Sequence, residues 1–156
     1  MVEILELGAG ANPHPLATVH HDRIIHSEWI DIAHDLTVFP WPFGEGSYDG
    51  IVAIDVFEHL KGVEIVEWLD ECHHVLKPGG FLMMRLPAWD NPLSYRDPTH
   101  YRVFHEQTFN YWDPDDALYE FFGSYYFQES DKWWRVKQVF REDGDWRYDL
   151  EKRGQS

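Results

Sequence analysis

The chain has 156 residues and a formal net charge of −15, with 26% charged and 17% aromatic side chains. A surface this acidic repels nucleic acid and anionic lipid, so we expect neither as a partner. The single cysteine excludes an internal disulfide, and the sequence has neither an apolar run of membrane-spanning length nor a secretory leader. We therefore expect one cytoplasmic domain that spans residues 1–156.

A short strand followed by a glycine turn opens the chain. Residues 3–7 alternate acidic and apolar side chains, as strands do, and Gly8-Ala9-Gly10 then makes a tight turn. Open α/β sheets bind small ligands at such turns, at the carboxyl ends of their strands. Pro13 stands near the position of the third glycine of a dinucleotide fold, and Pro15 follows, so the helix that would bind a pyrophosphate cannot form.

Three more strands are expected, over residues 18–22, 29–36 and 47–55, with a loop rich in proline and glycine over residues 37–46. These strands and the first one end in or beside an acid: Glu6, Asp22, Asp35 and Asp55. One acid at a strand end is an ordinary helix cap. Four acids along one sheet edge, beside a glycine turn, instead indicate a ligand site, in which Asp22 can accept both hydroxyls of a ribose.

An amphipathic helix is expected over residues 63–77, ended by Pro78-Gly79-Gly80 and followed by a strand over residues 81–86. Residues 87–123 form a long irregular segment, which is typical of a lid or a substrate-binding region. Within this segment a short helix begins at Asp113 and ends before Gly123.

The chain finishes in a β-hairpin that turns at Asp143-Gly144, after a minor strand over residues 125–128. The expected apolar faces of its two strands consist of Trp134, Val136 and Phe140, and of Trp146, Tyr148 and Leu150. The eight tryptophans of the chain exceed what a small core needs, so we expect some of them to face a ligand or a partner.

From residue 4 to residue 108 the sequence resembles the class I S-adenosylmethionine-dependent methyltransferases. The resemblance is carried by motifs in the family's order, above all Asp55-Val-Phe-Glu-His-Leu60 and Leu76-Lys-Pro-Gly-Gly-Phe81. It implies an α/β, Rossmann-like, mostly parallel sheet with a C-terminal antiparallel hairpin. It also implies S-adenosylmethionine as the cofactor and methyl transfer to an oxygen or nitrogen atom of a small-molecule acceptor.

The resemblance assigns roles to individual residues. Those implied to bind the cofactor are Glu6, Gly8, Ala9, Gly10 and Asn12 at the first turn, Asp22 and Arg23 at the ribose, Asp35 and Leu36 at the adenine, and Asp55, Val56 and Phe57 along the methionine. Phe57 and His59 are expected to open toward the acceptor. His100 and His59 are the preferred general bases, with His105 as an alternative, because histidine titrates near neutral pH.

The sequence departs from the family in two ways and leaves competing hypotheses open. It starts at the first strand and its first crossovers are too short for the usual helices, so one sheet face should be thinly covered. A second copy of the chain, or the tryptophans, would then cover this face. Glu58 and His59 lack a third ligand in the sequence pattern, so no metal is expected. The competing functions are a non-catalytic protein that binds S-adenosylmethionine and, more remotely, an NAD-dependent oxidoreductase.

Overall fold

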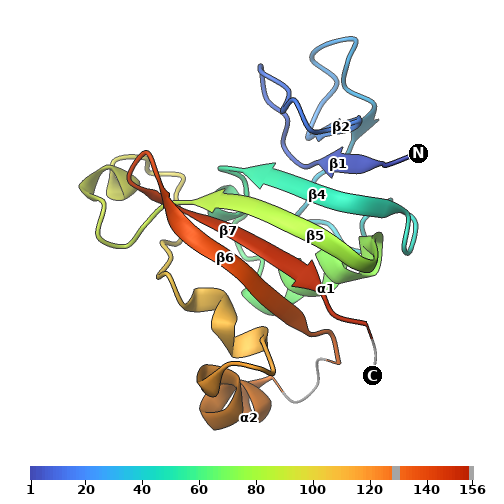
Figure 1. The fold of residues 1–156 in the computed structure, drawn as a ribbon. Helices are drawn as coiled ribbons and strands as arrows, with labels where there is room; N and C mark the ends of the chain where they lie inside the picture. Colours follow the sequence, from blue (N-terminus) through green and yellow to red (C-terminus); the bar gives the residue numbers. More distant parts are fainter. Residues whose placement is uncertain (128–130, 155–156) are drawn as a thin grey trace.

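A computed structural model describes residues 1–127 and 131–154 and contains one seven-stranded sheet (Figure 1). Its strands are β1 (Ile4–Glu6), β2 (Val19–Asp22), β3 (Ile32–Ala33), β4 (Tyr48–Ile54), β5 (Leu76–Leu86), β6 (Trp134–Glu142) and β7 (Asp145–Lys152). Their order in the sheet is β3-β2-β1-β4-β5-β7-β6. Strands β1 to β5 pair in parallel, whereas β7 is antiparallel to both β5 and β6. The predicted α/β sheet with a terminal hairpin is confirmed.

The main helix, α1 (Ile65–Val75), packs its apolar side on this sheet. The Glu64 backbone N–H donates to the Glu67 carboxylate over 2.9 Å, which completes a capping box at the start of the helix. Helix α1 is two residues shorter at each end than predicted, because Leu76 already pairs with Tyr48 as the first residue of β5. The glycines predicted to follow the helix therefore lie inside this strand.

Short helical turns interrupt the otherwise irregular connection between β5 and β6, and one more follows β4. The chain contains η1 (Phe57–His59), η2 (Pro92–Tyr95), η3 (Thr108–Trp112), the π-helical turn η4 (Tyr119–Gly123) and α2 (Ser124–Tyr126). The predicted end of the short helix before Gly123 is wrong, since Gly123 closes η4 and α2 follows it directly. A β-carbon at this glycine would lie 2.0 Å from the Tyr111 carbonyl oxygen, so only glycine allows η4 to approach η3 so closely.

Several strand predictions need correction. The third strand is only Ile32–Ala33, and Tyr125 and Tyr126 lie in α2, whereas Gln128 lies outside the described residues. Phe140 does not face the core and is 37% exposed. The reason is a shift of register between Val136 and Gln138, which exchanges the two faces of β6 along its length.

The two faces of the sheet differ in what covers them. Figure 1 shows α1 behind β4 and β5, and no helix of the described residues crosses the face toward the viewer. The core cluster on the α1 side includes four buried tryptophans, Trp41, Trp68, Trp112 and Trp134, which therefore do not cover the open face.

The open face carries charged side chains at its antiparallel end, where Arg147 lies 3.3 Å from the Glu142 carboxylate and 3.5 Å from that of Asp149. An antiparallel sheet can present such a face to water, so this end of the sheet does not require a second copy of the chain, and the homodimer stays a prediction. No helix within the described residues has the length and apolar character needed to cross a membrane.

Candidate active site at the carboxyl ends of the parallel strands

The parallel strands bring the four predicted acids to one edge of the sheet. Glu6 is in register with His20 of β2 and with Val52 of β4, so the residues that follow these strands emerge together. Asp22 is the last residue of β2, and Asp35 and Asp55 follow the ends of β3 and β4. The edge predicted from the sequence is therefore the edge that the fold builds.

The glycine turn after β1 is fixed by hydrogen bonds to β2. The Gly8 N–H donates to the Nδ1 atom of His21 over 3.3 Å, and the Gly10 N–H donates to the Asp22 carboxylate over 2.7 Å. The other ring nitrogen of His21 donates to the His34 carbonyl over 2.9 Å. Burial lowers the pKa of His21, which keeps the ring neutral and able to accept the Gly8 hydrogen bond.

A cavity of about 210 Å³ opens beside this turn. It is lined by Gly8, Asp22, Arg23, Asp35, Leu36, Asp55 and Val56 of the predicted cofactor residues, together with His21, His34, His59 and Leu60. Although partial burial acts in the opposite direction, hydrogen bonds from the Gly10 and Arg23 amides hold the pKa of Asp22 below its usual value. The Thr37 amide and hydroxyl lower the pKa of Asp35 in the same way. Both acids are therefore charged at neutral pH, and the cavity attracts cations.

Asp55 sits in a strained backbone position at the wall of this cavity. Its φ angle is 56°, in the left-handed region that residues other than glycine rarely adopt. Arg85 of β5 holds its carboxylate with two donors, the Nε atom at 3.0 Å and the Nη2 atom. Sequence reasoning missed Arg85, although a single basic residue within the apolar run 81–86 was a usable signal.

A second cavity, of about 360 Å³, shares Asp55 and His59 with the first one. We call it the acceptor-side cavity; its other lining residues are Glu58, Asn91, Leu93, Ser94, Arg96, Asp97, His100, Asp143 and Asp145. The segment 87–123 and the hairpin turn thus both contribute to it. Among the described residues Leu93 is the single aliphatic one in this lining, so the cavity favours a polar acceptor.

The two predicted bases meet in the acceptor-side cavity. The rings of His59 and His100 lie 4.7 Å apart in an edge-to-face arrangement. The Nδ1 atom of His59 is 2.8 Å from the Thr99 hydroxyl, and that of His100 donates to the Ser94 carbonyl over 2.7 Å. Beneath them lies Glu58, whose side chain is 1% exposed, and burial raises its pKa to about 8. Sequence reasoning had not recognised that Glu58 is buried.

Comparison with known proteins agrees with this geometry. Residues 5–82 match a family described as a methyltransferase domain. The chain belongs to the class I S-adenosylmethionine-dependent methyltransferases. No curated protein sequence matches the chain.

Solved structures share the fold at low sequence identity. A SAM-dependent methyltransferase from Archaeoglobus fulgidus is 13% identical with a TM-score of 0.63, over 97% of this chain and 86% of that one. The YcgJ protein from Bacillus subtilis is 13% identical with a TM-score of 0.61, over 99% and 93% of the two chains. Phosphoethanolamine N-methyltransferase 1 from Haemonchus contortus, in complex with phosphoethanolamine and S-adenosylhomocysteine, is 12% identical with a TM-score of 0.62, over 97% of this chain and 39% of that one.

Five residues implied to bind the cofactor do not line the 210 Å³ cavity of this methyltransferase: Glu6, Ala9, Gly10, Asn12 and Phe57. Gly10 borders a neighbouring groove of about 620 Å³, whereas Ala9 is buried and Asn12 is exposed. The Glu6 carboxylate is buried and bound within the protein, because it accepts from the His14 amide with both oxygens, each at 3.0 Å, and lies 2.7 Å from the Nδ1 atom of His20.

The prediction that Phe57 opens toward the acceptor is wrong. Its ring is 0% exposed and stacks on Trp68 with centroids 4.8 Å apart. The guanidinium of Arg102 lies 4.5 Å from the centroid of the Phe57 ring. Phe57 therefore anchors η1 to the core, and this anchor in turn positions its neighbours Glu58 and His59.

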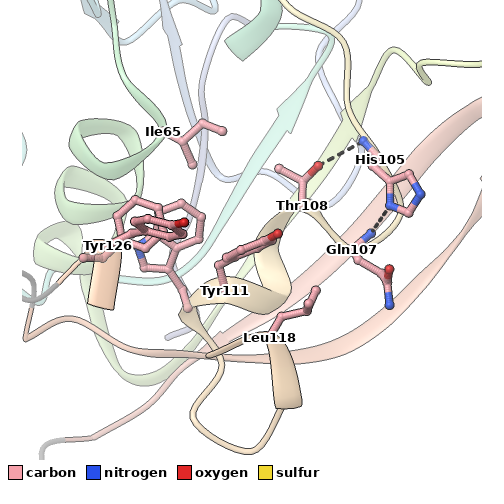
Figure 2. A pocket seen from close by; sticks show the side chains of 9 residues that line it. Ile65, His105, Gln107, Thr108, Tyr111, Leu118 and Tyr126 are labelled. Atoms are coloured by element: carbon pink, nitrogen blue, oxygen red, sulfur yellow. Dashed lines mark hydrogen bonds between the residues drawn. The ribbon is translucent and has the colours of Figure 1, made fainter. Parts of the chain in front are cut away.

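A pocket of about 510 Å³ lies elsewhere in the methyltransferase, between α1, η3 and α2 (Figure 2). The Nδ1 atom of His105, the alternative base, accepts there from the Gln107 amide over 3.1 Å, and the Thr108 hydroxyl accepts from the His105 amide over 2.9 Å. Among the described residues no acid lines this pocket, and none of its described lining residues is shared with the cavities at the strand ends. It suits neither the cationic cofactor nor a base acting at the strand ends.

Proposed function

We propose that the protein transfers a methyl group from S-adenosylmethionine to an oxygen or nitrogen atom of a small-molecule acceptor. The observation that carries this proposal is the pair of adjoining cavities at the strand ends. One is lined by Asp22, Asp35 and Asp55, and it shares Asp55 and His59 with the acceptor-side cavity. A donor in one cavity and an acceptor in the other would meet at this shared wall.

The charge of the cofactor supports its placement in the acid-lined cavity. S-adenosylmethionine carries an ammonium and a sulfonium, and both are attracted by neighbouring carboxylates. We place the ribose hydroxyls at Asp22, the adenine amino group at Asp35, the adenine edge at the Leu36 backbone and the methionine along Asp55. A volume of about 210 Å³ is below the usual range for small-molecule sites, so we expect the cofactor to extend past Asp55 toward the acceptor-side cavity.

Methyl transfer asks the protein mainly to align two reactants and exclude water. The bound cofactor would supply a methyl carbon on a sulfonium, to which the acceptor atom would bond as the carbon–sulfur bond breaks and its electron pair stays on sulfur. A hydroxyl or ammonium acceptor must also lose a proton. We assign this proton to the Nε2 atom of His59 or of His100, since the Nδ1 atoms of both rings are engaged with the protein.

Calorimetry with S-adenosylhomocysteine tests the cofactor assignment. We expect binding to the wild type, and an affinity at least tenfold lower in Asp35→Ala and Asp22→Ala, which is about 1.4 kcal/mol each. Glu45→Ala is the matched control, because this exposed acid precedes β4 at the opposite edge of the sheet. Unchanged affinity in both aspartate variants would refute the assignment. Binding without methylation of any acceptor tested would favour a non-catalytic protein that binds the cofactor.

A further inference from the structure

Three side chains with metal-binding atoms converge on one wall of the acceptor-side cavity: Glu58, His59 and His100. One candidate ligand atom from each lies within 4.8 Å of the other two. Glu58 and His59 are neighbours in η1, and His100 is brought to them by the Tyr101 amide, which donates to the Glu58 carbonyl over 2.8 Å. The third ligand that the sequence pattern lacked is thus supplied by a segment about forty residues away.

The hydrogen bonds of the two imidazoles leave their Nε2 atoms free for a ligand. The Thr99 hydroxyl donates to Asp97 over 2.6 Å, so it can only accept from the Nδ1 atom of His59. The Nδ1 atom of His100 likewise donates to the Ser94 carbonyl. A neutral imidazole that donates through Nδ1 carries its lone pair on Nε2. This is the arrangement in which histidines bind metals, with the second nitrogen held by a carbonyl or another oxygen.

The Glu58 carboxylate supplies an independent indication of a missing partner. Its side chain is 1% exposed, and its Oε2 atom has no hydrogen-bond partner among the described residues. The Oε1 atom lies 3.9 Å from the Nε2 atom of His59, which is too far for a hydrogen bond. Burying a carboxyl oxygen without a partner is costly, and a bound cation would remove this cost.

We propose that Glu58, His59 and His100 bind one divalent transition-metal ion of the zinc type. Two imidazoles and one carboxylate suit such an ion, whereas magnesium and calcium prefer oxygen ligands alone. Three protein ligands leave a coordination position open to the acceptor-side cavity. Zinc ligands at 2.0–2.1 Å in a tetrahedron lie about 3.3 Å apart, so side-chain rotations must draw these three together.

The ion extends the proposed function without depending on it. His59 lines both cavities, so an ion bound to His59 would lie at the wall that the two cavities share. The imidazoles would then act on the acceptor through the ion. A coordinated hydroxyl loses its proton more easily, which points to an acceptor with a metal-binding oxygen.

Zinc titration of the full chain, after removal of metal by a chelator, tests the site by calorimetry. We expect one zinc ion per chain, and binding at least tenfold weaker in Glu58→Gln, His59→Gln and His100→Gln. The matched control is His74→Gln, which replaces an exposed histidine of α1, and magnesium should give no binding heat. Equal zinc affinity in the wild type and all three ligand variants, or no binding by the wild type, would overturn the proposal.

X-ray absorption of the zinc-loaded wild type keeps the test valid if a variant fails to fold. The spectrum should contain two imidazole nitrogens at about 2.0–2.1 Å, and sulfur ligation or fewer than two imidazoles would overturn the site. Calorimetry with S-adenosylhomocysteine on the same sample separates the two proposals. Zinc binding without S-adenosylhomocysteine binding would count against the methyltransferase function alone, and the reverse result would count against the metal site alone.

Discussion

Gly8 is the position at which the glycine turn after β1 has the least room for an added β-carbon. Its φ angle is +67°, and a β-carbon there would lie 2.6 Å from the Cγ2 atom of Val56. In Gly8→Ala the left-handed backbone costs about 1 kcal/mol and the contact with Val56 about 2 kcal/mol more. Gly46→Ala is the matched control, because Gly46 has a φ of +57° and no atom within 4 Å of an added β-carbon.

Urea and thermal unfolding of the two variants measure the contact directly. A total of about 3 kcal/mol lowers the midpoint of a chain of this size by about 6 to 12 °C, against about 2 to 4 °C for Gly46→Ala. Since the turn must shift away from Val56, the affinity of Gly8→Ala for S-adenosylhomocysteine should also fall at least tenfold, and that of Gly46→Ala should not. Adding Val56→Ala to Gly8→Ala should relieve part of the loss, as a double-mutant cycle can show. If Gly8→Ala is no less stable than Gly46→Ala, the close packing of the turn on Val56 is wrong.

Two further predictions concern side chains of the core. Burial, reinforced by the charge of Lys152, lowers the pKa of His73 to about 4, so the folded state binds this proton less readily than the unfolded state does. The contribution of this group to the free energy of unfolding is present above pH 6.5 and is lost as the pH falls toward 4. Its full size is about 3 kcal/mol, of which about 2 kcal/mol disappears between pH 7 and pH 5. Urea unfolding should show this loss in the wild type but not in His73→Phe, whose ring can keep the contact with Trp134. Equal slopes of the free energy of unfolding against pH in the two proteins would contradict the prediction. Phe57→Leu should lower the free energy of unfolding by about 1 to 2 kcal/mol, because the stacking on Trp68 is lost. Its affinity for S-adenosylhomocysteine should stay within about twofold of the wild type. A larger change would show that Phe57 contacts the cofactor.

The edge of the sheet that carries the acids was predictable because two simple regularities determine it. Period-two alternation and apolar runs locate the strands, and parallel pairing sends their carboxyl ends in one direction. Asp22, Asp35 and Asp55 therefore had to meet once the strands were found, even though β3 is shorter than expected. Small errors at the strand boundaries do not move these acids to another edge.

Positions that depend on packing in three dimensions were not predictable. Phe57 follows Asp55 by two residues, as a lining residue could, but the tight turn of η1 directs its ring into the core. Phe140 continues the alternation of β6 in the sequence, whereas one shift of register moves it to the other face. His100 reaches Glu58 through a single backbone hydrogen bond from Tyr101, and no spacing rule encodes this contact.

The short first crossover shows how the site keeps its shape without the usual helix. Glu6 lies in the strand, yet both of its oxygens bind the His14 amide, so a buried carboxylate holds the connection that a helix would otherwise hold. His21 does the same for the turn, since its ring links the Gly8 amide to the His34 carbonyl and so joins the segments after β1 and β3. Each of these two buried side chains forms hydrogen bonds to two different residues. A few directed hydrogen bonds can thus supply the rigidity that a helix would otherwise give. The geometry of the cavity of about 210 Å³ therefore depends on residues beneath it as much as on the acids that line it.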